Sequence, residues 1–136
     1  MPILAWSKAL TLWVALLLVA TVNGVIREKL LIPGMGNYWG TFASGVVLSA
    51  SIFLVAFFTV RWYGILEPRC FWKIGMLWLA LTLLFEFTFG LFIAQRTWNE
   101  LLAAYMFRGG NIWPVVLVII LVSPWLSARL RGVARG

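Results

Sequence analysis

The chain has 136 residues, of which 63% are hydrophobic and 11% are charged, and its formal net charge is +7. A soluble domain carries roughly a quarter charged residues, so this composition excludes a soluble fold, a disordered chain and a nucleic-acid-binding domain. Long stretches without charge separate the charged residues, and a helix crosses about 30 Å of hydrocarbon in roughly 20 residues. The sequence therefore predicts an integral membrane protein.

The first predicted span covers residues 9–26, which contain no charged residue. The alternative is a cleaved signal peptide, with Lys8 in its basic region and a cleavage site near Val22-Asn23-Gly24. The apolar run is longer than the roughly 7–15 residues of a signal-peptide core, which favours a retained helix.

The second predicted span covers residues 39–60, after a connection punctuated by Pro33, Gly34 and Gly36. Small residues recur along one stripe of this helix, and such a stripe most often packs against another helix in a membrane. The stripe comprises Thr41, Ser44, Gly45, Leu48 and Ser51.

The third predicted span, residues 74–93, contains one carboxylate, Glu86. A charged side chain in the membrane costs roughly 2.5–3.5 kcal/mol on insertion scales, so Glu86 is expected to face the bundle and to be paired or protonated. Thr82 and Gly90 lie one turn to either side on the same stripe. Because both are small, they would let another helix approach Glu86 closely.

The end of the first span offers partners for this carboxylate. Asn23 and Arg27 are four residues apart and share a helix face, so Arg27 is predicted to pair with Glu86. Arg96 is a second candidate cation. The predicted intramembrane polar cluster is therefore Glu86, Asn23, Arg27, Arg96 and Thr82. It is interpreted either as a buried ion pair that sets helix register or as a proton- or substrate-linked site.

Residues 97–110 are less polar than a usual loop and favour an interfacial helix. The fourth predicted span covers residues 112–126, with Pro114 in its first turn, where a proline is tolerated. The predicted fold is all-α: one polytopic membrane domain over residues 1–136, with four transmembrane helices in a bundle.

Four spans place both termini on one side of the membrane. Seven of the 11 basic residues fall on that side, which predicts cytoplasmic termini. They are Lys8, Arg61, Arg69, Lys73, Arg129, Arg131 and Arg135, against Arg27, Lys29, Arg96 and Arg108. Tryptophan prefers the headgroup level, and seven of the nine tryptophans fall at predicted span boundaries, whereas Trp13 and Trp78 lie well inside a span.

The two outer connections share an order of residues that suggests an internal duplication. Glu28 precedes a dileucine and then the G-N-x-W of residues 36–39, and Glu100 precedes a dileucine and the G-N-x-W of residues 110–113. A parallel repeat would produce this order. The alternative is that outer turns independently reuse glycine, asparagine and tryptophan.

The sequence has no His and no Asp, and Cys70 is its only cysteine. It thus lacks the commonest general base and metal ligand, and it cannot form an internal disulfide. We predict no enzyme activity, no metal and no cofactor.

Three stretches follow one another along the chain: Asn23-Gly24-x-x-Arg27-Glu28, the LWLxLTxxFEFxFG run over residues 77–90, and Trp98-x-x-Leu101-Leu102-x-x-Tyr105. Together they resemble a group of short bacterial four-helix inner-membrane proteins to which no activity is assigned. The resemblance implies a bacterial inner-membrane location. The chain is not similar to the small multidrug resistance transporters, whose working glutamate lies in the first helix, or to the vitamin K epoxide reductases with their Cys-x-x-Cys.

Two functions are therefore expected. The first is a non-enzymatic accessory or structural component that associates laterally in the lipid bilayer, as a homo-oligomer or within a larger membrane complex. The second is an oligomeric small transporter or channel with Glu86 as the proton- or ion-coupling group. They differ in whether Glu86 faces a polar cavity or dry packing.

Overall fold

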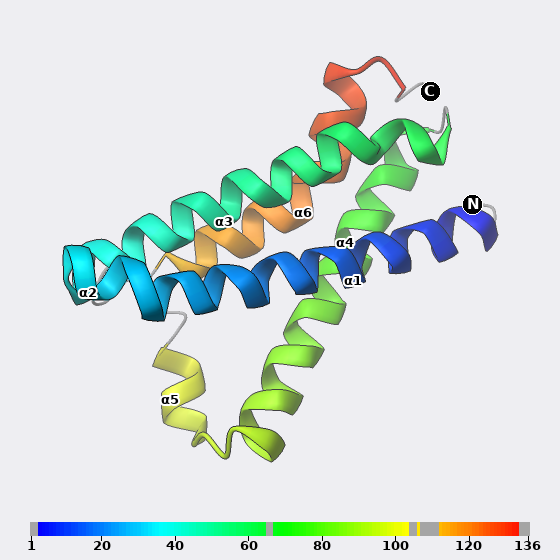
Figure 1. The fold of residues 1–136 in the computed structure, drawn as a ribbon. Coiled ribbons are helices and arrows are strands. Elements are labelled where there is room, and N and C mark those ends of the chain that lie inside the picture. Colours follow the sequence, from blue (N-terminus) through cyan, green and yellow to red (C-terminus); the bar gives the residue numbers. More distant parts are fainter. Residues whose placement is uncertain (1–2, 65–66, 104–105, 107–111, 134–136) are drawn as a thin grey trace.

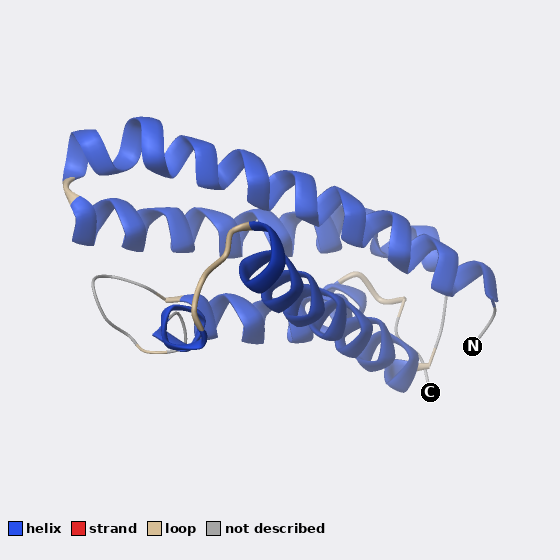
Figure 2. Cartoon of the chain, turned by 90° about the horizontal axis from the view of Figure 1, so that it is seen from below, coloured by secondary structure: helices blue, strands red, loops and turns tan. Residues whose placement is uncertain are grey.

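The computed structural model describes residues 3–64, 67–103, 106 and 112–133. These ranges consist of helices and short connections, without strands (Figures 1 and 2). Four of the helical runs are long and apolar enough to cross a membrane: Ala5–Met35, Asn37–Tyr63, Pro68–Ile93 and Trp113–Leu130. The predicted all-α fold with four membrane-spanning helices is confirmed.

The elements, in chain order, are α1 (Ile3–Ile26), η1 (Arg27–Leu31), α2 (Ile32–Met35), α3 (Asn37–Thr59), η2 (Val60–Tyr63), α4 (Pro68–Thr88), η3 (Phe89–Ile93), α5 (Trp98–Ala103) and α6 (Trp113–Leu130). The segments η1 and η3 are π-helical and η2 is a 3-10 turn. The π-helical segments continue α1 and α4 without a break, so both helices reach beyond their α-helical ends.

Prolines and one glycine set several helix ends. Pro68 and Pro114 lie in the first turns of α4 and α6, where the missing N–H would have no helical partner. Between α2 and α3 the chain reverses at Gly36, whose φ of 88° is rarely adopted by other residues. The first connection is therefore mostly helical rather than an extended loop.

The four long helices form a bundle with α3 and α6 packed together in the middle, α1 against α3, and α4 against α6. Helix α1 begins and α6 ends at the same end of the bundle, which we name the terminal end (Figure 1). The opposite end, which carries η1 and α2, is the hairpin end. Helix α4 crosses the others steeply, and its far part projects away from the bundle together with α5 (Figure 1).

The crossing of α4 and α6 is closest at Gly75. A Cβ atom at this position would lie 2.1 Å from the backbone carbonyl oxygen of Leu121. Phe71, Ile74 and Trp78 of α4 are fully buried around this crossing. The terminal-end half of α4 thus belongs to the core, and only glycine fits at position 75 without a backbone shift.

Two basic side chains bind carbonyls in the last turn of α3 and in η2, which follows it. Lys8 donates through Nζ to the carbonyl of Trp62 at 2.8 Å, and Arg131 donates to the carbonyl of Phe57 at 2.8 Å. Carbonyls at a helix end lack helical N–H partners and carry the negative end of the dipole, so cations are favourable there. These residues therefore connect α1 and α6 to α3, besides contributing to the charge asymmetry of the chain.

The connections after α1 and after α4 differ in conformation. Glu28 lies in η1, which continues α1, whereas Glu100 lies in the separate short helix α5. Thr97 caps α5, since the N–H of Glu100 donates to its Oγ1 at 3.2 Å. The described residues do not include Gly110 and Asn111 of the second G-N-x-W, and they do not include Tyr105 or Arg108. Internal duplication stays a hypothesis.

Candidate functional site

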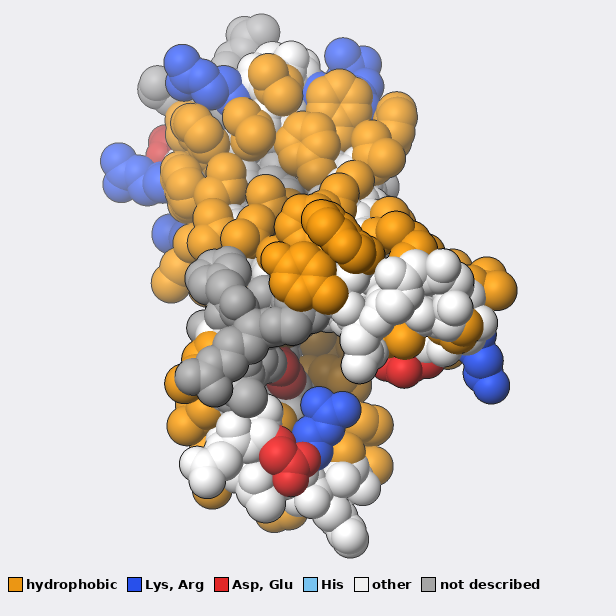
Figure 3. Space-filling model, turned by 90° about the vertical axis from the view of Figure 1, so that its left-hand side faces the viewer, with side chains coloured by type: hydrophobic (Ala, Val, Ile, Leu, Met, Phe, Trp, Pro, Cys, Tyr) orange, Lys and Arg blue, Asp and Glu red, His pale blue; other side chains and the backbone are white. Residues whose placement is uncertain are grey.

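A cavity of about 320 Å³ lies between the projecting part of α4 and the neighbouring parts of α1 and α6. We name it the Glu86 cavity. Figure 3 views the molecule from the hairpin end and shows the hollow beside the projecting arm, with acidic and basic side chains in and around it. The cavity is lined by Leu17, Ala20, Arg27, Thr82, Phe85, Glu86, Phe89, Gly90, Arg96 and Trp113.

Four of the five predicted cluster residues line this cavity: Arg27, Thr82, Glu86 and Arg96. Thr82, Glu86 and Gly90 share one face, as their four-residue spacing predicts. The close approach at Gly90 comes from α5, because a Cβ on this glycine would lie 2.5 Å from Cδ2 of Leu101. Gly90 thus allows another helix, α5, to approach this stripe closely.

Arg27 shares the cavity with Glu86 but forms a different ion pair from the predicted one. Its Nε lies 3.4 Å from Oε1 of Glu28, the next residue in the chain. The Arg27 side chain is 38% exposed and that of Glu28 63% exposed. At the end of a span, the nearest carboxylate along the backbone can pair with Arg27 while both groups stay partly hydrated.

Arg96 reaches the cavity because of a turn at the end of η3. Gln95 has a φ of 53°, and the N–H of Arg96 donates to the carbonyl of Gly90 at 2.7 Å. This bond joins residues six apart, one more than in the Schellman motif, because η3 is a wider π-helix, and the left-handed Gln95 ends the helix as such a residue does in that motif. The turn sends the chain back toward Glu86, so the exposed Arg96 side chain lines the same cavity.

Asn23, the fifth predicted residue, is directed to α3 instead. Its Nδ2 donates to the carbonyl of Ser44 at 3.2 Å, and Ser44 Oγ donates back to Asn23 Oδ1 at 2.6 Å. Both residues are buried. They line a neighbouring cavity of about 140 Å³, which shares Ala20, Arg27 and Trp113 with the Glu86 cavity. Asn23 therefore joins α1 to α3, and Ser44 of the predicted small-residue stripe is its partner.

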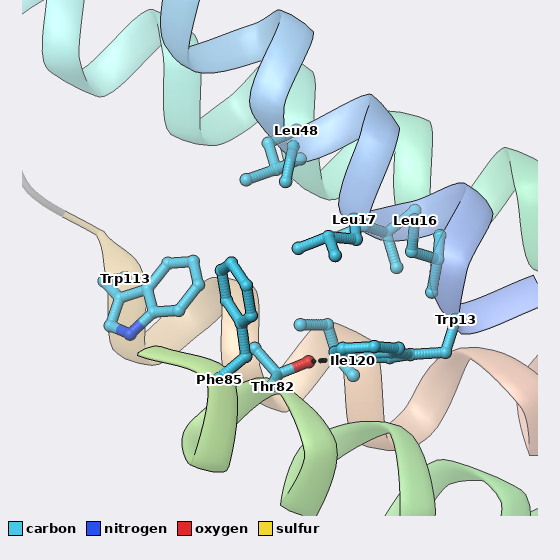
Figure 4. A pocket seen from close by; sticks show the side chains of 10 residues that line it. Trp13, Leu16, Leu17, Leu48, Thr82, Phe85, Trp113 and Ile120 are labelled. Atoms are coloured by element: carbon cyan, nitrogen blue, oxygen red, sulfur yellow. Dashed lines mark hydrogen bonds between the residues drawn. The ribbon is translucent and has the colours of Figure 1, made fainter. Parts of the chain in front are cut away.

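Two tryptophan hydrogen bonds join α1 to α4, and one of them ends on Thr82 of the Glu86 cavity. Trp13 of α1 donates through Nε1 to Thr82 Oγ1 at 3.1 Å, and Trp78 of α4 donates to the carbonyl of Ala9 at 2.9 Å. A void of about 50 Å³ adjoins the cavity, shares Thr82 and Phe85 with it, and is lined by mostly apolar side chains, Trp13 among them (Figure 4). Trp13 and Trp78 are the two tryptophans that the sequence places away from span boundaries. That position was the sequence signal that could have indicated a hydrogen-bond partner for each indole N–H.

Among the described residues, the cavity offers one carboxylate, two guanidinium groups and an aromatic wall. Guanidinium groups bind anions through paired N–H donors, and a carboxylate accepts hydrogen bonds from cations. Sequence reasoning missed the wall of Phe85, Phe89 and Trp113, because aromatic side chains are common throughout these spans. Within the described ranges, no group of three His, Cys, Asp or Glu residues could hold a metal ion.

Comparison of the chain with models of protein families, with curated proteins and with solved structures finds no match.

Proposed function

We propose that this multi-pass membrane protein is a non-enzymatic accessory or structural component that acts by lateral association in the bilayer. The exposure of α4 and its continuation η3 carries this proposal. Of an apolar stretch of 18 residues in this span, only 11% is buried inside the molecule, against 33% for α6. Met76 and Leu84 lie on one exposed stripe of α4. Such a face can pack against a neighbouring transmembrane helix.

The proposed location is the bacterial cytoplasmic membrane, with both termini in the cytoplasm. The resemblance to short bacterial inner-membrane proteins supports the location, and the excess of basic residues on the side of the termini supports the orientation. A cysteine placed at Ser7 should then resist an impermeant thiol reagent in intact cells, and one placed at Asn37 should react. Both would be made in a Cys70→Ser background.

Lateral association can be tested with a photo-crosslinking amino acid in place of Met76. We expect one discrete protein adduct from this position in native membranes, and none from a matched substitution of Leu18, an equally lipid-accessible residue of α1. An adduct with twice the 15.4 kDa mass of one chain would identify a second copy of the chain as the neighbour. Lipid adducts alone at both positions would refute the proposal.

Transport by an oligomer is the second candidate function, and the placement of Glu86 in a cavity that Arg27 and Arg96 also line favours it. The Trp13–Thr82 bond and the apolar side chains beneath it interrupt the cavity within one chain. A continuous path would therefore need several copies. Proton and ion flux into liposomes should disappear in Glu86→Gln and persist in Glu28→Gln. Absence of flux for the folded, inserted wild type would argue for association.

A further inference from the structure

The Glu86 cavity brings charges of both signs together at the hairpin end. Arg27 and Arg96 contribute two guanidinium groups and Glu86 one carboxylate. Within the described part of the chain, the Arg96 side chain has no ion pair, and the only ion pair of Arg27 is with the exposed Glu28. These guanidinium groups therefore retain donors for a phosphate. A ligand that carries a cation beside its phosphate can also donate to Glu86, because a carboxylate accepts several hydrogen bonds at once.

An apolar groove adjoins the charged cavity. It has a volume of about 370 Å³ and an almost wholly apolar lining: Trp13, Leu81, Leu84, Phe85, Thr88, Phe89 and Ile93. Phe85 and Phe89 line both the groove and the Glu86 cavity, so the two spaces share a wall. Between residues 81 and 93 the groove follows α4 for about 18 Å, at about 1.5 Å per residue. This length is close to one leaflet of a hydrocarbon core of about 30 Å.

We propose that the cavity and the groove form one binding site for a membrane phospholipid whose headgroup carries a phosphate and a primary ammonium, as in phosphatidylethanolamine. Arg27 and Arg96 bind the phosphate, Glu86 accepts hydrogen bonds from the ammonium, and one acyl chain lies in the groove between Trp13 and α4. A charged headgroup beside an acyl-length apolar groove is what an amphiphile requires. This inference goes beyond lateral association and does not depend on it.

The ammonium is the discriminating feature. A quaternary ammonium, as in phosphatidylcholine, has no N–H to donate to Glu86, and phosphatidylglycerol has a phosphate but no cation. Both share the acyl chains and the phosphate with phosphatidylethanolamine. Differences in binding among the three lipids therefore report on the contact with Glu86.

The test measures retention of each lipid, with identical acyl chains, by native mass spectrometry of the full chain in detergent. We expect half-saturation by phosphatidylethanolamine at a concentration about tenfold lower than by the other two lipids, as one charge-assisted hydrogen bond predicts. Glu86→Gln should abolish this preference. Arg96→Gln should weaken binding of all three lipids. Glu67→Gln removes a carboxylate in the connection before α4. It is the matched control and should leave the binding of all three lipids unchanged.

Two further experiments distinguish the contribution of the headgroup to binding from that of the acyl chain. Thr88→Trp would fill the groove without changing charge, and it should weaken phosphatidylethanolamine binding with the protein still folded by circular dichroism. Soluble phosphoethanolamine in excess should fail to displace the lipid. Equal retention of the three lipids by the wild type, an unchanged preference in Glu86→Gln, or displacement by phosphoethanolamine would each overturn the proposed site. Arg96 is exposed, so its variant provides a test even where Glu86→Gln does not fold.

Discussion

The two halves of α4 are both apolar in sequence but have opposite surroundings. In the terminal-end half, Phe71, Ile74 and Trp78 are fully buried against the other helices. In the other half, Phe85 and Phe89 are exposed, and Glu86 lines a cavity. The difference follows from the crossing at Gly75, because helices that touch closely at one point and cross steeply must separate further along. Close packing in one half thus leaves room for the Glu86 cavity beside the other.

The largest expected difference between the halves is in the free energy of unfolding after truncation of a phenylalanine. Phe71→Ala should lower it by about 3–5 kcal/mol, because the large side chain is fully buried and leaves a void. Phe92→Ala, in the η3 continuation of α4, should change it by about 0.5 kcal/mol or less, because Phe92 is 76% exposed. Unfolding by SDS in mixed micelles measures both. Similar losses for the two variants would contradict the division of α4 into a buried and an exposed half.

The next largest effect is expected at the crossing itself. Gly75→Ala should lower the free energy of unfolding by about 1–3 kcal/mol, because its Cβ would lie 2.1 Å from the Leu121 carbonyl oxygen, which belongs to backbone. Gly34→Ala is the matched control, since nothing lies within 4 Å of its added Cβ. The same SDS titration applies. If Gly75→Ala is as stable as the control, the close approach of α4 and α6 is not what separates their far ends.

Sequence reasoning predicted the four spans and the common face of Thr82, Glu86 and Gly90, because both depend on local spacing along one helix. It paired Arg27 with Glu86, whereas the structure pairs Arg27 with Glu28. It also overlooked Gly75. Which helix a residue meets depends on crossing geometry, and a glycine among apolar residues has no signal of its own in one sequence. Trp13 and Trp78 did have a signal, since a tryptophan inside a span needs a partner for its N–H.

The smallest expected effect concerns the two tryptophan bonds at the boundary between the halves of α4. Trp78→Phe should lower the free energy of unfolding by about 1–2 kcal/mol, because the fully buried indole loses contacts and its bond to Ala9. Trp13→Phe should lower it by about 1 kcal/mol or less, because the bond to Thr82 is only partly buried. Thr82→Val removes the same bond from the other side, so the double variant with Trp13→Phe should lose less than the sum of the two single losses. Strict additivity would show that Trp13 and Thr82 are not coupled. The floor of the Glu86 cavity would then be held by packing around Phe85 alone.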